Sequence, residues 1–373
     1  MPAEVPIALL PGDGIGPEVI RESVKVLQAA ATTSGFSVAL TEFLIGGAAI
    51  DARGVPFPEE TLRGCQAAEA VLLGAVGGPA WDHLPGSARP EAGLLQLRRA
   101  LGVFANLRPV RVLPALASLS PLRPEIAAAT DLLIVRELIG GVYYGQPRGR
   151  TADAAVDTMR YTAGEIARVA RMACTLARQR RGRVTSVDKA NVLETSRLWR
   201  ETVDSVAREF PDVTVEHMLV DTCALQLVRA PGQFDVIVTE NMFGDILSDE
   251  AGAITRSLGM LPSASLGDRP PFLYEPVHGS APTLAGKGVA NPVGAILSVA
   301  LLVRHSLGQV EASRAIEAAV EQVLADGVRP RDLGGEASTA EVGDRVVEEV
   351  MRRALPRARD GATRRGSTLP KET

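Results

Sequence analysis

The sequence predicts an α/β protein built around a largely parallel sheet, and two observations support this. Short apolar segments with strand character alternate with longer segments whose apolar residues recur at helical spacing. Such alternation is typical of parallel strands that are connected by helices. Several apolar segments also end at charged or amide residues, and open α/β sheets bind ligands at the carboxyl ends of their strands. The 373 residues suffice for one large domain or two ordinary ones.

The first strand is predicted at residues 5–10, and Pro17 suits the first position of the helix that follows. Apolar residues between Ile20 and Ala31 recur at helical spacing, so they share one face of that helix. The next predicted elements are a strand at 71–76, a loop rich in Gly and Pro at 77–90, and a helix at 91–101.

The same alternation continues along the chain. Further strands are predicted at 131–135, 184–187, 213–220 and 236–238. Further helices are predicted at 163–180, 293–307, 311–325 and 341–355. Residues 140–160 are polar and rich in turn formers, which indicates an excursion that reaches toward another subunit. Residues 351–373 are basic and contain Pro and Gly, which predicts a disordered tail.

The composition is typical of a globular protein of enzyme size. Hydrophobic residues make up 46% of the chain. The net charge of −4 arises from mixed signs, so we expect neither nucleic acid nor a membrane as a partner. No apolar run is long enough for a membrane span, and the first residues lack the features of a secretion signal, which favours a cytoplasmic protein. Cys65, Cys174 and Cys223 form no CxxC motif, so we expect reduced thiols.

Two carboxylates lie in the helix that is expected after the strand at 236–238. Asp245 and Asp249 are four residues apart, so they share one helical face about one turn apart. Hard oxygen ligands in this arrangement suit Mg²⁺ or Mn²⁺. The alternative is an acidic first helical turn that the helix dipole favours. Spacing alone does not separate the two interpretations.

Three other predicted strands end at side chains that complement this pair. Arg136 follows the strand at 131–135, Lys189 follows the next strand, and Asp221 follows the strand after that. Asp221 would supply a third carboxylate, and the two cations would balance the charge. Only four of the 40 basic residues are lysines, so Lys189 points to a role that arginine cannot fill, such as losing a proton.

Two glycine-rich segments are candidates for cofactor contacts. The segment from Pro11 to Val19 follows a strand and opens a helix, but its glycines run GxGxG rather than GxGxxG. It therefore predicts a tight turn near a ligand and not a Rossmann dinucleotide site. In the segment from Glu275 to Asn291, small residues and free N–H groups suit close approach to a phosphate. An ordinary surface loop is the alternative there.

Seven longer motifs occur in order between about residues 5 and 350. They are Leu-Leu-Pro-Gly-Asp-Gly-Ile-Gly-Pro-Glu-Val, Gly-Gly-Pro-Ala-Trp-Asp, Phe-Ala-Asn-Leu-Arg-Pro, Ser-Val-Asp-Lys-Ala-Asn-Val-Leu, Phe-Gly-Asp-Ile-Leu-Ser-Asp-Glu, Leu-Pro-Ser-Ala-Ser-Leu-Gly and Glu-Pro-Val-His-Gly-Ser-Ala-Pro. In these motifs the chain resembles the isocitrate/isopropylmalate dehydrogenase family of β-decarboxylating dehydrogenases.

The resemblance implies the two-domain α/β fold of that family, with a mostly parallel sheet, and not a Rossmann fold. Residues 1–103 plus 257–350 would form a discontinuous cofactor-binding domain. Residues 104–256 would form the substrate, metal and dimerisation domain, with an arm near 140–160. The family forms homodimers whose active site takes Lys189 and Asp221 from the neighbouring subunit.

The resemblance also assigns roles to individual residues. Tyr143 matches the catalytic acid, and Lys189 matches the base. The residues that match the substrate contacts are Arg98, Arg108, Arg136 and Asp221 around the polar groups, with Leu94 and Leu95 at the alkyl group. The metal ligands, for Mg²⁺ or Mn²⁺, are matched by Asp221, Asp245 and Asp249. The NAD contacts are matched by Gly78, Glu91, His278, Gly279, Ser280, Ala281, Thr283, Ala290 and Asn291.

The activity that the resemblance implies is the NAD-dependent oxidative decarboxylation of 3-isopropylmalate to 4-methyl-2-oxopentanoate, a step of leucine biosynthesis. The alternatives are another 3-substituted malate or tartrate as the substrate, or a non-catalytic regulatory subunit. A different substrate such as tartrate would favour polar or charged residues at positions 94 and 95, but both are leucine. A regulatory subunit would have lost catalytic residues, and none is lost.

The sequence departs from the family pattern at three positions. Thr283 replaces the aspartate that is usual in relatives that use NAD. Ile139 replaces a threonine next to the site, and Glu240 replaces a small residue before Asn241. These departures leave the catalytic residues intact.

Overall fold

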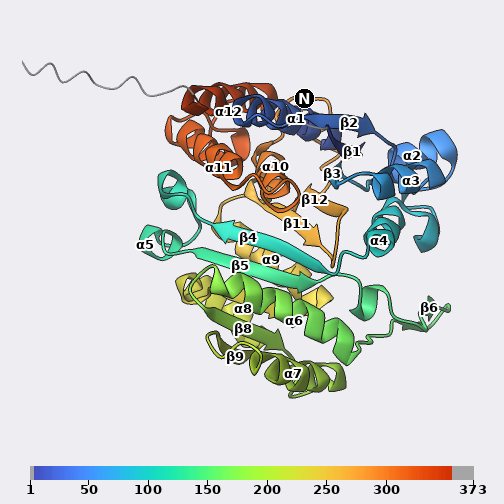
Figure 1. The fold of residues 1–373 in the computed structure, drawn as a ribbon. Coiled ribbons are helices and arrows are strands. Elements are labelled where there is room, and N and C mark those ends of the chain that lie inside the picture. The colour runs from blue at the N-terminus through green and yellow to red at the C-terminus, as the bar shows by residue number, and fades with distance from the viewer. Residues whose placement is uncertain (1–3, 355–373) are drawn as a thin grey trace, which may run out of the picture.

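The structure, a computed structural model, describes residues 4–354, and in this range most strands form a single ten-stranded sheet (Figure 1). In spatial order the strands are β2 (Val38–Glu42), β1 (Val5–Gly12), β3 (Ala70–Ala75), β12 (Phe272–Pro276), β11 (Pro262–Leu266), β4 (Ala105–Arg111), β5 (Asp131–Glu137), β10 (Val236–Thr239), β8 (Arg183–Asp188) and β9 (Thr214–Leu219).

Both outer parts of the sheet are parallel, and the centre is antiparallel. β11 pairs in the antiparallel sense with β12 and β4, and β4 pairs likewise with β5. All other neighbouring pairs of this sheet are parallel. The prediction of a mostly parallel α/β fold is confirmed, with a mixed sheet as the refinement.

The helices cover both faces of the sheet (Figure 1). They are α1 (Gly16–Ser34), α2 (Gly46–Arg53), α3 (Glu59–Ala67), α4 (Pro90–Leu101), α5 (Pro124–Ala127), α6 (Ala163–Arg178), α7 (Glu194–Ala207), α8 (Val220–Arg229), α9 (Asn241–Ile254), α10 (Val293–His305), α11 (Val310–Ala325) and α12 (Thr339–Ala354). Within residues 4–354 none of them combines the length and the apolar character that a membrane crossing requires.

Alternation along the strands explains why both faces need helices. On β1, Ile7 and Leu9 share a core with α1 and α10, whereas Ala8 and Leu10 share a core with α3 and α4. Successive strand residues point to opposite faces. A strand that is buried on both faces therefore shows the continuous apolar run that predicted it.

The same logic holds in the other half of the sheet. On β5, Leu133 and Val135 pack with α6, whereas Leu132 and Ile134 pack with α8 and α9. This packing fixes the position of α9 relative to the end of β5. Side chains of both elements consequently meet at one place.

The turn between β1 and α1 is tight, as predicted. Gly12 and Gly14 have φ values of 72° and 59°, a region that favours glycine. A Cβ on Gly14 would lie 2.0 Å from the carbonyl oxygen of Ser280. The Asp13 carboxylate accepts three backbone N–H groups, each at 2.8 Å, from the start of α2 and the loop after β3. The turn therefore fastens this part of the chain to the segment that begins near Ser280.

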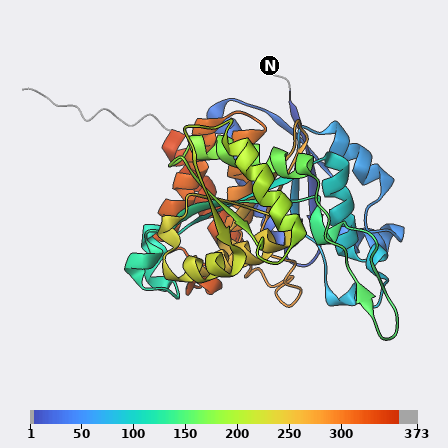
Figure 2. The ribbon, with the colours of Figure 1, turned by 90° about the horizontal axis from the view of Figure 1, so that it is seen from below.

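A short antiparallel hairpin projects from the body of the molecule within the predicted excursion (Figures 1 and 2). It consists of β6 (Gly149–Arg150) and β7 (Ala155–Val156), and its strand residues are exposed. Contact of this hairpin with a second subunit stays a prediction, as does the division into domains at residues 103 and 257.

Some element boundaries differ from the predictions. β5 extends through Arg136 and Glu137, so these residues belong to the strand and do not follow it. Val220 opens α8 instead of ending the preceding strand. Residues 351–354 complete α12, in agreement with the helix predicted at 341–355 and against a tail that begins at residue 351. The rest of the predicted tail, 355–373, lies outside the described residues.

Candidate active site

One cavity of about 390 Å³ brings together many of the predicted site residues. Residues of β3, α4, β4, β5, β11, β12 and α9 line it. The predicted site residues in the lining are Glu91, Leu94, Leu95, Arg98, Arg108, Arg136, Tyr143, Asp245, His278 and Gly279.

Three arginines converge on this cavity from three elements. Arg98 lies on α4, Arg108 on β4 and Arg136 on β5, and their exposed fractions are only 8%, 6% and 2%. Burial lowers the pKa of Arg108 to about 10, with Arg136 as the second cause, yet Arg108 stays cationic at neutral pH. Buried cations of like charge are costly without anions. The cavity is therefore suited to an anionic ligand.

Polar neighbours fix two of these guanidinium groups. Arg98 Nη2 donates to Glu275 Oε1 at 2.8 Å, while its buried Nε has no hydrogen-bond partner among residues 4–354. Arg108 Nε donates to Asn106 Oδ1 at 2.7 Å, and its Nη1 donates to Ser248 Oγ at 2.5 Å. Arg98 thus retains an unused buried donor beside the cavity.

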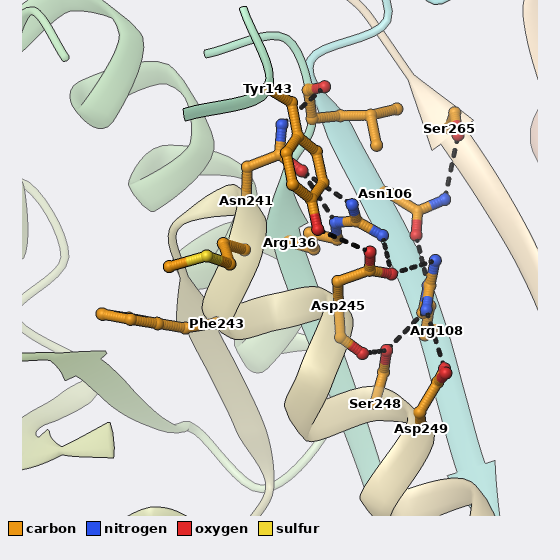
Figure 3. Close-up of polar contacts among 12 residues, drawn as sticks. Asn106, Arg108, Arg136, Tyr143, Asn241, Phe243, Asp245, Ser248, Asp249 and Ser265 are labelled. Atoms are coloured by element: carbon orange, nitrogen blue, oxygen red, sulfur yellow. Dashed lines mark hydrogen bonds and ion pairs between the residues drawn. The ribbon is translucent and has the colours of Figure 1, made fainter. Parts of the chain in front are cut away.

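Arg136 connects the strand β5 to the helix α9 (Figure 3). Its Nε and Nη2 donate to Asn241 Oδ1 at 3.0 and 2.8 Å. Its Nη1 donates to Asp245 Oδ1, and the Tyr143 hydroxyl donates to Asp245 Oδ2 at 3.0 Å. Arg136, Tyr143 and Asp245 therefore form one connected group at the cavity wall.

The electrostatics of this group keep Asp245 ionised and Tyr143 protonated. Burial alone would raise the pKa of Asp245, but Arg136 and Arg108 outweigh it and lower that pKa. Burial, and then the Asp245 charge, raise the pKa of Tyr143 above its ordinary value. Tyr143 therefore carries its proton at neutral pH, which is the protonation state that a general acid requires.

Asp245 and Asp249 lie on the same side of α9, as their spacing predicts (Figure 3). Arg108 is 3.4 Å from Asp245 and 3.6 Å from Asp249. Two hard carboxylates on adjacent turns fit a divalent cation. However, residues 4–354 of one chain contain no group of three or more His, Cys, Asp or Glu side chains that is arranged for a metal ion. Asp245 and Asp249 are therefore a candidate pair of metal ligands, and the metal site stays a prediction.

Lys189 and Asp221 meet each other but do not line the cavity. Lys189 follows β8, Asp221 lies in the first turn of α8, and Lys189 Nζ is 2.6 Å from Asp221 Oδ1. The hydrogen bond from Lys189 lowers the pKa of the exposed Asp221. The structure therefore separates the predicted base and third metal ligand from the other predicted residues of the same chain.

Glu91, His278 and Gly279 are the predicted cofactor residues that line the cavity. Gly78, Ser280, Ala281, Thr283, Ala290 and Asn291 lie outside its lining, and the last five belong to the segment from Glu275 to Asn291. The backbone holds this segment at both ends, because Ile15 N–H donates to Ser280 O at 2.8 Å and Thr339 Oγ1 donates to Ala290 O at 2.7 Å. Between these anchors Thr283 is exposed.

Sequence reasoning missed four polar residues that organise the site. Glu275 pairs with Arg98, Asn106 and Ser248 bond Arg108, and Asn241 bonds Arg136. Asn106 stands two residues before Arg108 on a strand, so strand alternation places both on one face. Ser248 and Asn241 lie four or fewer residues from Asp245 on the same helix, a signal that helical spacing carries.

Comparisons with known proteins agree with this geometry. The family profile described as isocitrate/isopropylmalate dehydrogenase matches residues 6–346. The 3-isopropylmalate dehydrogenase of Anaeromyxobacter dehalogenans is 56% identical over 348 residues, which cover 92% of this chain and 99% of that protein. The 3-isopropylmalate dehydrogenase of Moorella thermoacetica is 58% identical over 352 residues, which cover 92% of this chain and 98% of that protein.

Solved structures show the same fold. An isocitrate dehydrogenase from Methylococcus capsulatus superposes with a TM-score of 0.83 and 34% identity, covering 93% of this chain and 99% of that one. A β-decarboxylating dehydrogenase from Thermococcus kodakarensis in its apo form superposes with a TM-score of 0.78 and 37% identity, covering 93% and 96%. Because this family profile matches residues 6–346, which is more than nine-tenths of the chain, this chain belongs to the isocitrate/isopropylmalate dehydrogenase family.

Proposed function

We propose that the protein catalyses the NAD-dependent oxidative decarboxylation of 3-isopropylmalate, in a homodimer that binds a divalent cation. The carrying observation is one cavity that combines Arg98, Arg108 and Arg136 with Tyr143 and Asp245. Leu94 and Leu95 line the same cavity. A substrate with two carboxylates and a branched alkyl group would satisfy both the buried cations and the apolar wall.

The cofactors would be held by the groups already described. Asp245 and Asp249, with the partner subunit's Asp221, would bind Mg²⁺ or Mn²⁺, while His278, Gly279 and the segment after them would contact NAD. The cation supplies Lewis-acid polarisation at the C2 oxygen of the substrate, and NAD supplies the hydride acceptor.

The side chains then account for the movement of protons. The partner subunit's Lys189 would accept the proton of the C2 hydroxyl while the hydrogen on C2 leaves as hydride to NAD, which gives a β-keto acid. The bond between C3 and its carboxylate breaks, CO₂ leaves, and the electron pair forms the enolate. Tyr143 donates its proton to C3, which regenerates the ketone as 4-methyl-2-oxopentanoate. The three arginines orient the substrate carboxylates throughout.

A homodimer would bring Lys189 and Asp221 to the cavity of the second subunit. Exposed apolar side chains on α8 and α9 support this arrangement, because Leu225 and Ile246 are each 60% exposed. They lie on the same two helices as Asp221 and Asp245. An apolar surface next to charged site residues is typical of a subunit interface that completes a site.

A substrate panel followed by NADH absorbance tests the proposal. We expect turnover of 3-isopropylmalate, and a kcat/KM for unsubstituted malate that is lower by about 10–200-fold for each lost methylene-sized contact. Tartrate should be poorer still, because its second hydroxyl would meet Leu94 and Leu95. Equal kcat/KM values for malate and 3-isopropylmalate would exclude the assigned alkyl pocket.

Removal of the cation tests the metal site. Exhaustive chelation should abolish turnover, and Mg²⁺ or Mn²⁺ should restore it. Asp249→Asn should weaken the affinity for Mn²⁺, measured calorimetrically with the purified dimer. Full activity after chelation, with residual metal excluded by elemental assay, would contradict the proposed ligand set.

A further inference from the structure

Glu240 is a buried carboxylate that the proposed chemistry does not use. Its side chain caps the N-terminus of α9, where Oε1 accepts the N–H of Phe243 at 2.7 Å and Oε2 accepts the N–H of Met242 at 3.0 Å. The residue is only 4% exposed. A smaller cap such as Ser or Asp would satisfy the same N–H groups, so capping alone does not explain a glutamate here.

Glu240 also reaches the next residue, Asn241, through a tyrosine. The hydroxyl of Tyr161 donates to Glu240 Oε2 at 3.1 Å and accepts the N–H of Asn241 at 3.0 Å. Burial, followed by the Glu240 charge, raises the pKa of Tyr161, so this hydroxyl keeps its proton and stays a donor. The first turn of α9 is thus fixed by a side chain from outside the helix.

Asn241 in turn fixes the plane of the Arg136 guanidinium (Figure 3). Its Oδ1 accepts both Nε and Nη2 of Arg136, and its Nδ2 donates to Leu138 O at 3.1 Å and to Gly140 O at 3.0 Å. Every donor and acceptor of this amide is therefore engaged. If the backbone at Asn241 shifts, the arginine has to follow.

We propose that Glu240 is a positioning residue for Arg136, acting through Tyr161 and Asn241 to hold the guanidinium in the orientation that receives a substrate carboxylate. The inference rests on the proposed role of Arg136 in substrate binding. A guanidinium pairs with a carboxylate in two parallel bonds only when its plane is correctly oriented. Loss of the link should therefore weaken substrate binding more than it weakens the fold.

Two variants separate positioning from capping. Tyr161→Phe keeps the Glu240 cap and removes the hydroxyl link, whereas Glu240→Ser keeps a cap and withdraws the group that reaches Tyr161. In each we expect the KM for 3-isopropylmalate to rise about fivefold to tenfold, the effect of a lost hydrogen bond at the binding site. The KM for NAD should stay at the wild-type value.

Asp235→Asn provides the matched control. Asp235 is also a buried carboxylate that accepts two backbone N–H groups, those of Arg181 and Arg183, but it precedes β10 at the end opposite Glu240. This variant should lose thermal stability and keep both KM values. A rise in substrate KM in Asp235→Asn equal to that in Glu240→Ser would assign the effect to general destabilisation and overturn the proposal.

A double-mutant cycle gives the decisive readout. In an Arg136→Lys background the planar guanidinium is absent, so adding Glu240→Ser should raise KM no further. Additive effects would show that Glu240 does not act through Arg136, and unchanged KM values in both link variants would show that it does not position the site. Turnover of 3-isopropylmalate by the wild-type chain tests the proposed function separately. The variants are then compared on whichever malate the wild type oxidises. Failure of the proposed substrate and failure of the proposed role of Glu240 are therefore distinguishable.

Discussion

Glu137 is fully buried at the end of β5, directly after Arg136. Its carboxylate accepts the N–H of Gly140 at 2.8 Å and that of Ile139 at 3.2 Å, and Arg168 is 3.7 Å away. These contacts form the bend that leads from the strand to Tyr143. Burial nevertheless raises the pKa of Glu137 from 4.5 to about 7, because the backbone donors do not replace the lost hydration completely.

This raised pKa gives a stability that depends on pH. The folded state favours protonated Glu137, so the stabilising contribution is complete below pH 4.5 and is lost as the pH rises through about 7. Glu137→Gln cannot ionise. We expect the free energy of unfolding of the wild type, relative to the variant, to fall by on the order of 2 kcal/mol between pH 4.5 and 8. Urea titrations at both pH values measure this difference, and an equal difference at both would contradict the raised pKa.

Thr283 is the residue at which cofactor preference should be tested. It is exposed in the segment that we propose to contact NAD, and its side chain offers one hydroxyl and no negative charge. Thr283→Asp should lower the KM for NAD and widen the preference over NADP, by about 1–2 kcal/mol for a charge-assisted hydrogen bond. Leu284→Asp, which adds the same charge one residue along, is the control and should not lower the KM. Unchanged KM values for both cofactors in Thr283→Asp would show that this residue does not contact the adenosine ribose of NAD.

At the scale of elements, helix α1 secures the proposed cofactor segment through Glu18. Its carboxylate accepts the N–H of Gly286 and, at 3.0 Å, that of Gly288. Both glycines have positive φ values, 75° and 62°, so this stretch of the segment is a turn whose N–H groups point toward the helix. Glu18 therefore provides two hydrogen bonds that attach this turn to α1.

Glu18→Ala should release this turn and weaken cofactor binding. We expect the KM for NAD to rise about tenfold, since two charge-assisted hydrogen bonds are lost at a partly exposed site. The kcat at saturating NAD should change little. Glu60, an exposed acidic residue in the first turn of α3, is the matched control, and Glu60→Ala should leave both values unchanged. A changed kcat with an unchanged KM for NAD would argue against an anchoring role.

Strands with a continuous apolar run were predictable, whereas β4, β11 and β12 at the centre of the sheet were not. β1, β3, β5 and β10 carry continuous apolar runs, and α1, α4 and α6 have apolar residues at helical spacing. β11, by contrast, reads Pro-Ser-Ala-Ser-Leu, whose small residues lack a strand pattern although they are buried. Its strand conformation comes from pairing with β4 and β12, which are distant in sequence. The residues of β11 alone give no signal of this pairing.

The site shows the same division between local and distant information. Spacing on one helix predicted that Asp245 and Asp249 share a face, and strand ends predicted that Arg136 lies nearby. The links from Glu240 through Tyr161 to Asn241 span about eighty residues of sequence, and no periodicity connects them. Likewise Glu275 meets Arg98 only because β12 lies beside β3. The sequence therefore predicted the residues that carry the chemistry, whereas the contacts that support them are visible only in the folded structure.

At the scale of the whole molecule, the position of Lys189 and Asp221 is the feature that one chain does not explain. They bind each other on the surface near α8, whereas Tyr143 and Asp245 lie at the cavity. The proposed shared site would resolve this, because the second subunit would place its own Lys189 and Asp221 at the cavity of the first. The exchange would be reciprocal under twofold symmetry.

Mixed dimers test this arrangement directly. Tyr143→Phe and Lys189→Ala homodimers should each be nearly inactive, since every site lacks one group. In a dimer with one variant of each kind, the cavity of the Tyr143→Phe chain receives the altered residue 189 as well and carries both lesions. The other cavity keeps its own Tyr143 and receives the intact Lys189 of its partner. Co-refolding equal amounts should thus restore roughly a quarter of wild-type activity, since half the dimers are mixed and each has one intact site.

Two controls make the outcome decisive. Differently tagged chains, purified in tandem, isolate the mixed dimers and should show about half of the wild-type activity per dimer. Pairing Tyr143→Phe with Arg98→Ala, two groups that line one cavity of the same chain, should restore nothing. This is expected because each cavity of that mixed dimer still lacks one of the two groups. Isolated mixed dimers of Tyr143→Phe and Lys189→Ala that remain inactive would place Lys189 in the site of its own chain, and the cavity would then have to close by a movement within one subunit.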